Sequence, residues 1–541
     1  MNNLFRKIVA FAIIAIMPIC MFACDTSNSG TNPSSSPIDS NSSYNRGDSS
    51  SSGAQDGKVN LTLVSINDIH GSIEQNEDGT KGLSNTARLI DKMSANYGKS
   101  GKDVRADVAL FGNGDMFQGT AISNMSRGKA VIAAMNDMRF DAMSLGNHEF
   151  DWGIETVTAY FDGDESNGEA NFPLVTANVY QKSSQTYISD LSEDDNVVNG
   201  VIVEKSGVKV GYIGVIGPVE NSIIASNVQD YSFRQDYVVD RVKDIALELK
   251  NDGADIITVS IHYDDYYNNE FAAIENNGDY LVDVIFNGHT HTTYSQTVRR
   301  PDGSTIPAIQ GGANNRAFSY VKLTYSTDNG QIKYNDYGYR MIMDYDSDYD
   351  KTVESTIREY KTNLIDSLPV LATSSVTVSH SNQLCDYIAN TAIAALQTEY
   401  FASNYGGLRS NGNITEGKPV KEDAFYKIIP FDNAMYVVKI RGEGLYNFYT
   451  KQSKNYYFGK NNNAKNFESL ENDQNYYTLA IIDYVYTSVY FSNFMQYVDK
   501  STEVNTQVYL RDILVEDARL CGLAGKKWSY NNTPFIGPID Y

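Results

Sequence analysis

Five of the six histidines in this 541-residue chain lie in short motifs that also contain aspartate or asparagine. The candidate metal-ligating side chains in these motifs are Asp68, His70, Asp115, Asn147, His262, His289 and His291. Imidazole nitrogens combined with carboxylate and amide oxygens suit Zn²⁺, Mn²⁺ or Fe²⁺ better than a thiolate structural site. A single histidine could belong to the core, but five placed in this way predict a metal centre.

Each motif directly follows an apolar, β-prone segment of the chain. These segments span residues 59–66, 107–113, 140–145, 254–261 and 282–287. Layered α/β folds place their binding loops just past the carboxyl ends of strands. From about residue 58 onward, strands alternate with helical or irregular connections, which predicts a layered α/β fold.

Length and charge narrow the possible functions. A chain of 541 residues exceeds what one hydrophobic core usually supports, so we expect two domains. The hydrophobic content of 41% suits a globular protein, and the net charge of −23 argues against binding a nucleic-acid polymer through basic patches. If the substrate is an anion, so acidic a protein needs bound cations to hold it, and metal ions are the obvious candidates.

The amino terminus resembles a bacterial lipoprotein signal. Two basic residues precede an apolar stretch that is too short to span a bilayer comfortably, and the letters MFAC end at Cys24. We expect residues 1–24 to be a signal peptide, with Cys24 anchoring the protein by lipid to the membrane on the extracytoplasmic side of the bacterial cell envelope. An ordinary secretory signal with an incidental cysteine is the alternative. Residues 25–57 are rich in Ser and Asn and predict a disordered linker.

Together the motifs resemble a known superfamily. The resemblance is carried by His262 and by the segments NDIHG (67–71), GDMFQG (114–119), GNHEFDWG (146–153), NFPLVTANV (171–179) and NGHTH (287–291). They look like the metallophosphoesterase, or calcineurin-like, signature and, within it, the bacterial 5′-nucleotidase family. The resemblance implies a four-layer α/β/β/α catalytic sandwich over residues 58–343. It also implies a smaller α+β substrate-binding domain over residues 371–541.

The resemblance further implies two divalent metal ions. The ligands would divide into a first-metal set (Asp68, His70, His291) and a second-metal set (Asn147, His262, His289), with Asp115 as the bridging carboxylate. Two such ions polarise phosphoryl oxygens and turn a water molecule into the in-line nucleophile. Asp68 and His70 would therefore lie two residues apart at the end of one strand because both bind the same ion.

His148 lies beside these ligands without matching one. In the family this histidine pairs with the aspartate three residues on, here Asp151, and stabilises charge in the transition state of phosphoryl transfer. A carboxylate fixes the tautomer of an imidazole and favours its charged form, so the pairing is chemically reasonable. The alternative is that both residues only cap the loop. We expect Glu149 to stabilise the loop rather than to catalyse.

In residues 344–370 the apolar residues recur with the spacing of a helix instead of that of a strand. Val353, Ile357, Tyr360 and Leu364 fall on one apolar stripe of a helix, which ends before a proline. With the family resemblance, this predicts a helix that connects two domains. Periodicity alone allows equally well a terminal helix packed wholly on the first domain.

Two segments in the second half resemble the family's nucleotide-recognition elements. They suggest Asn404 and Arg409 as substrate contacts and Phe431 as an aromatic ring that stacks on the base. A guanidinium binds phosphate or ribose through parallel hydrogen bonds, and an aromatic face stacks on any base. For Phe431, ordinary core packing is the alternative.

The chain departs from the family after these segments. A Gly-Gly-Asp-Gly-aromatic segment usually supplies the other side of the base clamp, but residues 480–494 here read AIIDYVYTSVYFSNF. Tyr490, Phe491 and Phe494 are the candidate substitutes, and the sequence does not choose among them. Catalytic chemistry is therefore better defined by the sequence than substrate identity.

Three functions are compatible with these patterns. The first is a cell-surface 5′-nucleotidase that releases phosphate from extracellular nucleotides for nucleoside and phosphate salvage. The second keeps the metal chemistry but acts on 2′,3′-cyclic nucleotides and 3′-nucleotides, on UDP-sugars or on another small phosphoester. The third is a non-enzymatic surface binding lipoprotein. We favour an enzyme because every metal-ligand position of the superfamily is filled.

Overall fold

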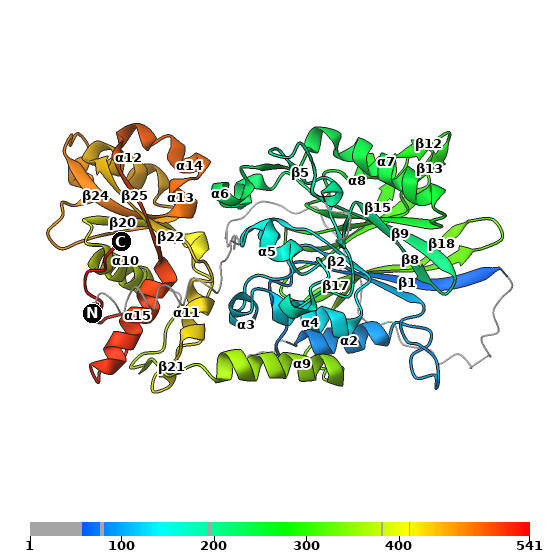
Figure 1. Ribbon diagram of the computed structural model, residues 1–541, viewed down its shortest axis with the longest axis horizontal. Coiled ribbons are helices and arrows are strands. Elements are labelled where there is room, and N and C mark those ends of the chain that lie inside the picture. The colour runs from blue at the N-terminus through cyan, green and yellow to red at the C-terminus, as the bar shows by residue number, and fades with distance from the viewer. Residues whose placement is uncertain (1–56, 76–80, 192–195, 380–381, 411) are drawn as a thin grey trace, which may run out of the picture.

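The computed structural model describes residues 57–75, 81–191, 196–379, 382–410 and 412–541. The predicted signal peptide and nearly all of the predicted linker lie outside these residues. Figure 1 shows two bodies side by side, a larger one built from β1 to β18 and a smaller one built from the later strands. We call them the larger and the smaller domain.

Two sheets form the centre of the larger domain. The first has the order β18-β17-β1-β2-β3-β4-β7, and the second has the order β15-β16-β14-β11-β9-β8. The first sheet comprises β18 (Ile332–Met341), β17 (Ala317–Ser326), β1 (Lys58–Ile66), β2 (Val108–Asn113), β3 (Ala142–Ser144), β4 (Leu174–Val175) and β7 (Val197–Val198). The second comprises β15 (Thr293–Arg299), β16 (Thr305–Gly311), β14 (Val284–Asn287), β11 (Ile256–His262), β9 (Val208–Ile216) and β8 (Gly200–Lys205).

Helices cover the outer faces of both sheets. The first sheet packs against α2 (Leu83–Asp91) and α4 (Lys129–Met138), on which α9 (Lys351–Lys361) lies, and the second against α7 (Val238–Asn251) and α8 (Asn268–Ala272). A third apolar cluster, which includes Leu63, Phe111, Tyr212 and Phe286, fills the space between the sheets. The predicted four-layer α/β/β/α sandwich is confirmed.

Strand direction brings the polar motifs to one edge. β1, β2, β3 and β4 run parallel in the first sheet, and β9, β11, β14 and β16 run parallel in the second. Their central strands are buried on both faces, which explains their nearly continuous apolar sequences. The loops that follow β1, β2, β3, β11 and β14 therefore meet at the carboxyl ends of the strands.

Helix α9 is shorter than the predicted segment 344–370. The Asp350 carboxylate accepts hydrogen bonds from the backbone amides of Thr352 and Val353 and begins the helix. Val353 and Ile357 are buried against α4 and α2, and a π-helical turn over Thr362–Asp366 follows. The helix therefore packs on the larger domain, and only its end reaches the smaller one.

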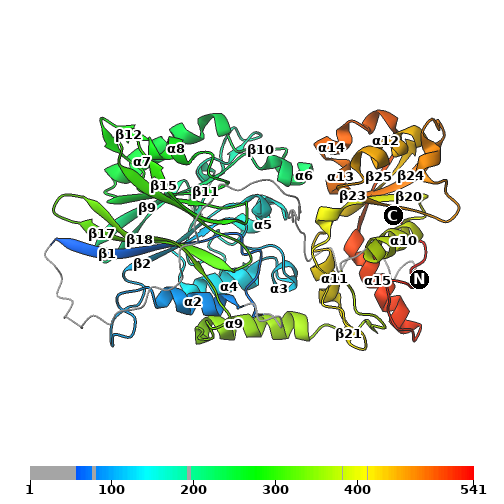
Figure 2. The same cartoon turned by 180° about the vertical axis from the view of Figure 1, so that it is seen from behind.

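The smaller domain is built on one five-stranded sheet of order β23-β20-β24-β22-β25 (Figure 2). Its strands are β23 (Tyr456–Lys460), β20 (Tyr400–Asn404), β24 (Tyr476–Ile482), β22 (Ala434–Arg441) and β25 (Val498–Tyr509). Its main helices are α10 (Asn382–Leu396), α11 (Glu422–Ile428), α12 (Gly442–Gln452) and α15 (Leu510–Leu523). One apolar cluster joins the sheet and these helices, as an independent α+β core requires.

The domains touch through two short helices. Ala121 on α3 (Ala121–Met125) packs against Tyr426 on α11, with Met125 and Ile365 beside them. Beyond α11, the Asn124 side-chain amide donates to the Pro430 carbonyl over 3.2 Å. These contacts place the loop that carries Phe431 against the larger domain.

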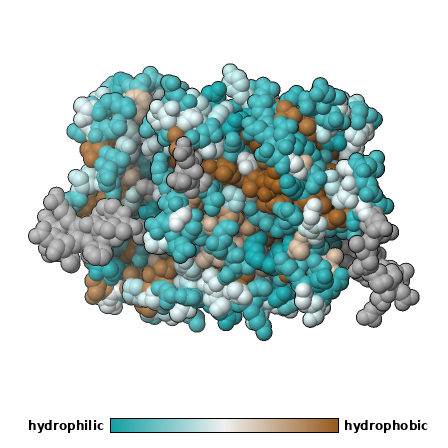
Figure 3. Space-filling view, turned by 45° about the vertical axis from the view of Figure 1, so that its right-hand side comes forward, coloured by the Kyte–Doolittle hydropathy of each residue, from teal (hydrophilic) through white to brown (hydrophobic). Residues whose placement is uncertain are grey.

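The face shown in Figure 3 is mostly hydrophilic and carries several apolar patches. Within the described ranges, no helix combines the length and apolar character needed to cross a bilayer.

Candidate metal centre

The polar loops adopt an unusual backbone conformation. Five of the seven predicted ligands have positive φ angles, namely Asp68 (51°), His70 (47°), Asp115 (53°), His289 (70°) and His291 (59°). Non-glycine residues seldom adopt this left-handed region, and such strain gathers at functional sites. The positive φ angles therefore mark the turns that carry most of the predicted ligands.

Two glycines let these loops approach one another. A Cβ atom on Gly114, whose φ is +72°, would lie 2.5 Å from both the Gly146 nitrogen and His262 Nδ1. A Cβ atom on Gly146 would lie 2.3 Å from Asp115 Oδ1. Side chains at these two positions would push apart the loops that carry Asp115 and Asn147.

The predicted ligands gather in two overlapping clusters. One contains Asp68, His70, Asp115 and His291, and the other contains Asp115, His262 and His289, with the possible ligand atoms of each cluster within 4.8 Å of one another. Asp115 is common to both clusters, which is the geometry that a bridging carboxylate requires. Asn147 begins a short 3-10 turn beside Asp115 and is fully buried.

Backbone carbonyls orient two of the histidine rings. His70 Nδ1 lies 3.0 Å from the Gln118 carbonyl, and His262 Nδ1 lies 2.9 Å from the Asn113 carbonyl. Because a carbonyl only accepts, both Nδ1 atoms carry the proton, which leaves Nε2 directed into the centre as a ligand atom. His70 Nε2 faces His291 Nε2 at 3.1 Å.

The chemistry of the donor set fits a divalent cation. Both polar side-chain atoms of Asn147 are buried and have no hydrogen-bond partner among the described residues. Buried polar atoms are nearly always paired, so these atoms need a partner of another kind. Nitrogen and oxygen donors without sulfur suit Zn²⁺, Mn²⁺ or Fe²⁺.

The charged groups in the centre lie close enough to shift one another's pKa. Burial raises the pKa of the Asp115 carboxyl, but the His148 and His262 rings outweigh it and hold that pKa well below its usual range. Burial lowers the pKa of His262, yet the Asp115 carboxylate at 3.2 Å raises it to about 10. A protonated His262 thus balances the buried carboxylates, and a cation can take over this role while displacing the proton.

Glu149 ties two of the loops together. Its Oε1 accepts a hydrogen bond from the Met116 amide, and its Oε2 accepts from the amides of Asp115 and Gly146, all at 2.7–2.8 Å. Burial raises the pKa of Glu149 to about 7. The geometry agrees with the expectation that Glu149 stabilises the loop.

His148 and Asp151 form the predicted pair. His148 Nδ1 lies 2.6 Å from Asp151 Oδ2, and both side chains are buried. His148 Nε2 lies 3.8 Å from Asp115 Oδ2, so this second ring nitrogen faces the metal-ligand cluster. The His148 amide also donates to Asp115 Oδ1 over 2.9 Å, which fixes the loop and the carboxylate relative to each other.

Comparisons with known proteins agree with this geometry. Residues 61–293 match the family described as calcineurin-like phosphoesterase. The chain is 24% identical over 440 residues to a snake venom 5′-nucleotidase of Crotalus adamanteus, an alignment that covers 72% of this chain and 69% of the relative. The chain contains a calcineurin-like phosphoesterase domain and is similar to 5′-nucleotidases. Metal-dependent hydrolysis of phosphoesters is therefore its chemistry.

Two further relatives show how far the similarity reaches. Endonuclease YhcR of Bacillus subtilis (strain 168) is 26% identical over 414 residues, which cover 72% of this chain and 32% of that protein. The crystal structure of a 5′-nucleotidase precursor from Thermus thermophilus superposes with a TM-score of 0.65 at 18% identity, covering 89% of this chain and 100% of the other. The two-domain fold of the 5′-nucleotidase family thus extends over most of the chain.

The predicted substrate contacts lie together in the smaller domain. A Cβ atom on Gly407 would lie 3.1 Å from Asn404 Oδ1 and 3.9 Å from Phe431 Cδ2. The guanidinium carbon of Arg409 lies 5.4 Å from the centre of the Phe431 ring. Phe431 is only 1% exposed, so in this arrangement its ring packs in the core, and stacking on a base requires movement around it.

Arg409 links this group to the metal-ligand cluster. Burial lowers the pKa of His148 well below its usual range, and the positive charge of Arg409 acts in the same direction. Burial likewise lowers the pKa of His70 to about 4, again with a contribution from Arg409. A side chain of the smaller domain therefore lies within electrostatic range of the predicted metal ligands.

Segment 480–494 contains both buried and exposed aromatics. Phe491 and Phe494 are buried, and each ring centre lies 5.0 Å from that of Phe448 in the core of the smaller domain. Tyr490 on α14 (Val489–Ser492) is 54% exposed. Of the three candidates for the second side of a base clamp, Tyr490 alone is available to a ligand in this arrangement.

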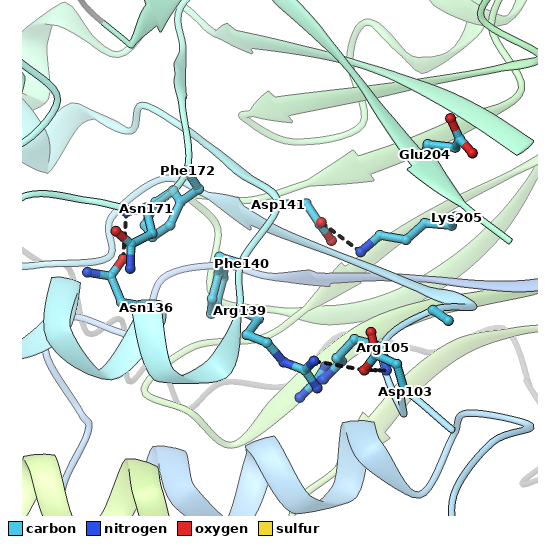
Figure 4. A pocket seen from close by; sticks show the side chains of 11 residues that line it. Asp103, Arg105, Asn136, Arg139, Phe140, Asp141, Asn171, Phe172, Glu204 and Lys205 are labelled. Atoms are coloured by element: carbon cyan, nitrogen blue, oxygen red, sulfur yellow. Dashed lines mark hydrogen bonds and ion pairs between the residues drawn. The ribbon is translucent and has the colours of Figure 1, made fainter. Parts of the chain in front are cut away.

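A cavity of about 360 Å³ lies at the opposite edge of the sheets (Figure 4). Residues just before β2 and β3 line it, whereas the metal-ligand loops follow these strands. Its cations are paired with carboxylates, Arg139 with Asp103 over 2.8 Å and Lys205 with Asp141 over 2.7 Å. The cavity is therefore separate from the metal centre, and its charges are balanced by the protein itself.

One positioning residue, Asn113, was not predicted from the sequence. Asn113 ends β2, and its side-chain amide donates to the Phe286 carbonyl of the second sheet over 3.2 Å, while its own carbonyl orients His262. An asparagine at the end of an otherwise apolar, fully buried strand was the available signal. Such a residue must find polar partners inside the protein.

Proposed function

We propose that this protein is a cell-surface 5′-nucleotidase with two divalent metal ions, which releases phosphate from extracellular nucleotides for nucleoside and phosphate salvage. Support comes from the two clusters of predicted ligands that share Asp115. The names of relatives such as the snake venom 5′-nucleotidase point to the same class of substrate. The identity of the metals, their number and the nucleotide specificity are parts of this proposal.

Each group at the strand ends has a distinct task in this proposal. The first-metal ligands are Asp68, His70 and His291, the second-metal ligands are Asn147, His262 and His289, and Asp115 bridges. When bound, the cations supply charge to the phosphoryl oxygens and activate water. His148, held by Asp151, presents Nε2 to the phosphoryl group and stabilises charge that develops in the transition state.

One observation carries the nucleotide assignment. Arg409, which lies over the Phe431 ring, has its charge within range of His70 and His148. A ligand with a phosphate at the metal centre and a flat ring several bonds away would reach from one domain to the other. Asn404 and Arg409 would bind the sugar and phosphate parts, and Phe431 or Tyr490 would contact the base.

The altered segment 480–494 supports a second candidate. A 2′,3′-cyclic nucleotide, a 3′-nucleotide or a UDP-sugar needs the same metal chemistry but other contacts around the leaving group. Because this segment lacks the glycines of the family pattern, its contacts to the substrate differ as well. The difference bears on specificity and leaves the proposed catalytic residues untouched.

A substrate panel tests the proposal. The purified protein is stripped of metal, given Mn²⁺ or Zn²⁺, and assayed for phosphate release from AMP, 3′-AMP, 2′,3′-cyclic AMP and UDP-glucose, with a single-stranded oligonucleotide as a fifth substrate. We expect the highest kcat/KM with AMP and no turnover without metal. A preference for the cyclic nucleotide or UDP-glucose would favour the second candidate, and cleavage of the oligonucleotide alone would contradict both.

A further inference from the structure

A buried ion pair lies directly behind the loop that carries Phe431. The Arg511 guanidinium pairs with the Asp432 carboxylate, and the two residues are 2% and 3% exposed. Arg511 belongs to the first turn of α15, and Asp432 lies in the short loop between α11 and β22. The pair therefore joins two segments that are about 80 residues apart in the chain.

Arg511 also holds the neighbouring helix. Its guanidinium carbon lies 3.7 Å from the centre of the Tyr426 ring, at the distance of a close cation–π contact. Beside it, the Leu510 amide donates to the Asn433 carbonyl over 3.1 Å. The start of α15 thus contacts Asp432 and Asn433 in the Phe431 loop and Tyr426 on α11.

The two segments held by Arg511 are those that meet the larger domain. Pro430, directly before Phe431, accepts the hydrogen bond from Asn124, and Tyr426 packs against Ala121. The ion pair therefore adjoins both Phe431, the proposed base contact, and the residues through which the smaller domain contacts the larger one. A shift of the Asp432 backbone would move the Phe431 ring and the Pro430 carbonyl together.

We propose that Arg511 and Asp432 are positioning residues for nucleotide binding, which fix the Phe431 loop against the larger domain without touching the substrate. This inference rests on the proposed nucleotidase function. A buried ion pair often adds little net stability, but each partner keeps the other's charge compensated, so the two groups stay together. Lysine offers the same charge without a flat guanidinium to stack on the Tyr426 ring, so it should hold the loop less well.

The test separates binding from chemistry. In Arg511→Lys we expect KM for AMP to rise about tenfold, with kcat within twofold of wild type. For p-nitrophenyl phosphate, which has no base, we expect kcat/KM to stay within twofold. Asp432→Asn, which keeps the shape of the side chain, should give the same pattern. Arg519→Lys is the matched control, because Arg519 lies on the same helix and pairs with Glu516 at a partly exposed position. It should leave kcat and KM for both substrates unchanged.

Folding is followed in the same samples. Trp528 is buried in the core of the smaller domain and Trp152 in that of the larger one, so a red shift of the tryptophan emission reports unfolding of either domain. Equal losses with both substrates, unchanged KM for AMP, or a red-shifted emission in both variants would overturn the positioning role. A wild-type enzyme that hydrolyses p-nitrophenyl phosphate but no nucleotide would instead refute the proposed function.

Discussion

His148 and Asp151 form a 2.6 Å contact between Nδ1 and Oδ2, and the opposite ring nitrogen of His148 faces Asp115 at 3.8 Å. The ring is therefore oriented by a carboxylate on one side and presented to the metal-ligand cluster on the other. It lies beside the predicted ligands without belonging to either cluster. This arrangement separates two properties that experiments can measure independently, metal content and turnover.

Replacing His148 by Ala should retain both metals and lower kcat by about 10²- to 10⁴-fold, the usual contribution of a positioned acid–base group. Asp151→Asn should give a smaller loss, because the ring remains but its orientation is less well fixed. Elemental analysis and steady-state kinetics on the same preparations check this. Loss of metal in proportion to activity would show that His148 is a ligand.

Replacing Asp115 by Asn should weaken both metals at once, because a neutral amide is a poor bridge between two cations. His70→Ala should mainly affect one metal, since His70 belongs to only one of the two clusters. Metal stoichiometry after dialysis distinguishes the variants. The bridging role fails if Asp115→Asn retains the wild-type stoichiometry.

Replacing Glu149 by Gln should destabilise the larger domain by about 1–3 kcal/mol, the usual cost of leaving buried donors without an acceptor. The carboxylate accepts from three backbone amides, whereas a carboxamide has one oxygen and turns an amino group toward the remaining donors. Urea unfolding of the metal-free protein measures the difference. Glu165→Gln, in an exposed turn, is the control and should leave the free energy of unfolding unchanged.

Replacing Phe431 by Leu tests the proposed base contact while keeping an apolar side chain in the core. KM for AMP should rise about tenfold, since a stacked base contributes roughly 1–3 kcal/mol. Hydrolysis of p-nitrophenyl phosphate should change little. If both substrates lose activity equally, Phe431 acts through packing alone, as its 1% exposure in this arrangement would then explain.

Replacing Cys24 by Ala should move the protein from the membrane fraction to the soluble fraction and leave its specific activity intact. The reason is that the predicted lipid attachment site would be lost while every proposed site residue lies beyond residue 67. Fractionation followed by mass spectrometry of the amino terminus checks this. A variant that stays in the membrane with residues 1–23 attached would identify the apolar stretch itself as the anchor.

Much of the larger domain could be predicted because its signals are local. Apolar runs ending in Asp68, Asp115 or His262 marked both the strands and the edge at which they meet. The close contacts could not be predicted, because they depend on side chains distant in sequence. Asn124 and Pro430 are 306 residues apart, and nothing in either segment specifies the other. The burial of Phe431 likewise follows from how α11 and α15 pack.

Among the described residues, the chain passes between the two domains once, after the π-helical turn Thr362–Asp366. All proposed metal ligands precede this passage, and all proposed contacts to the organic part of the substrate follow it. An ancestral gene could therefore exchange or remodel its second half by recombination while its catalytic half stayed intact. Substrate preference can then change through segments such as 480–494 while the proposed metal ligands stay the same.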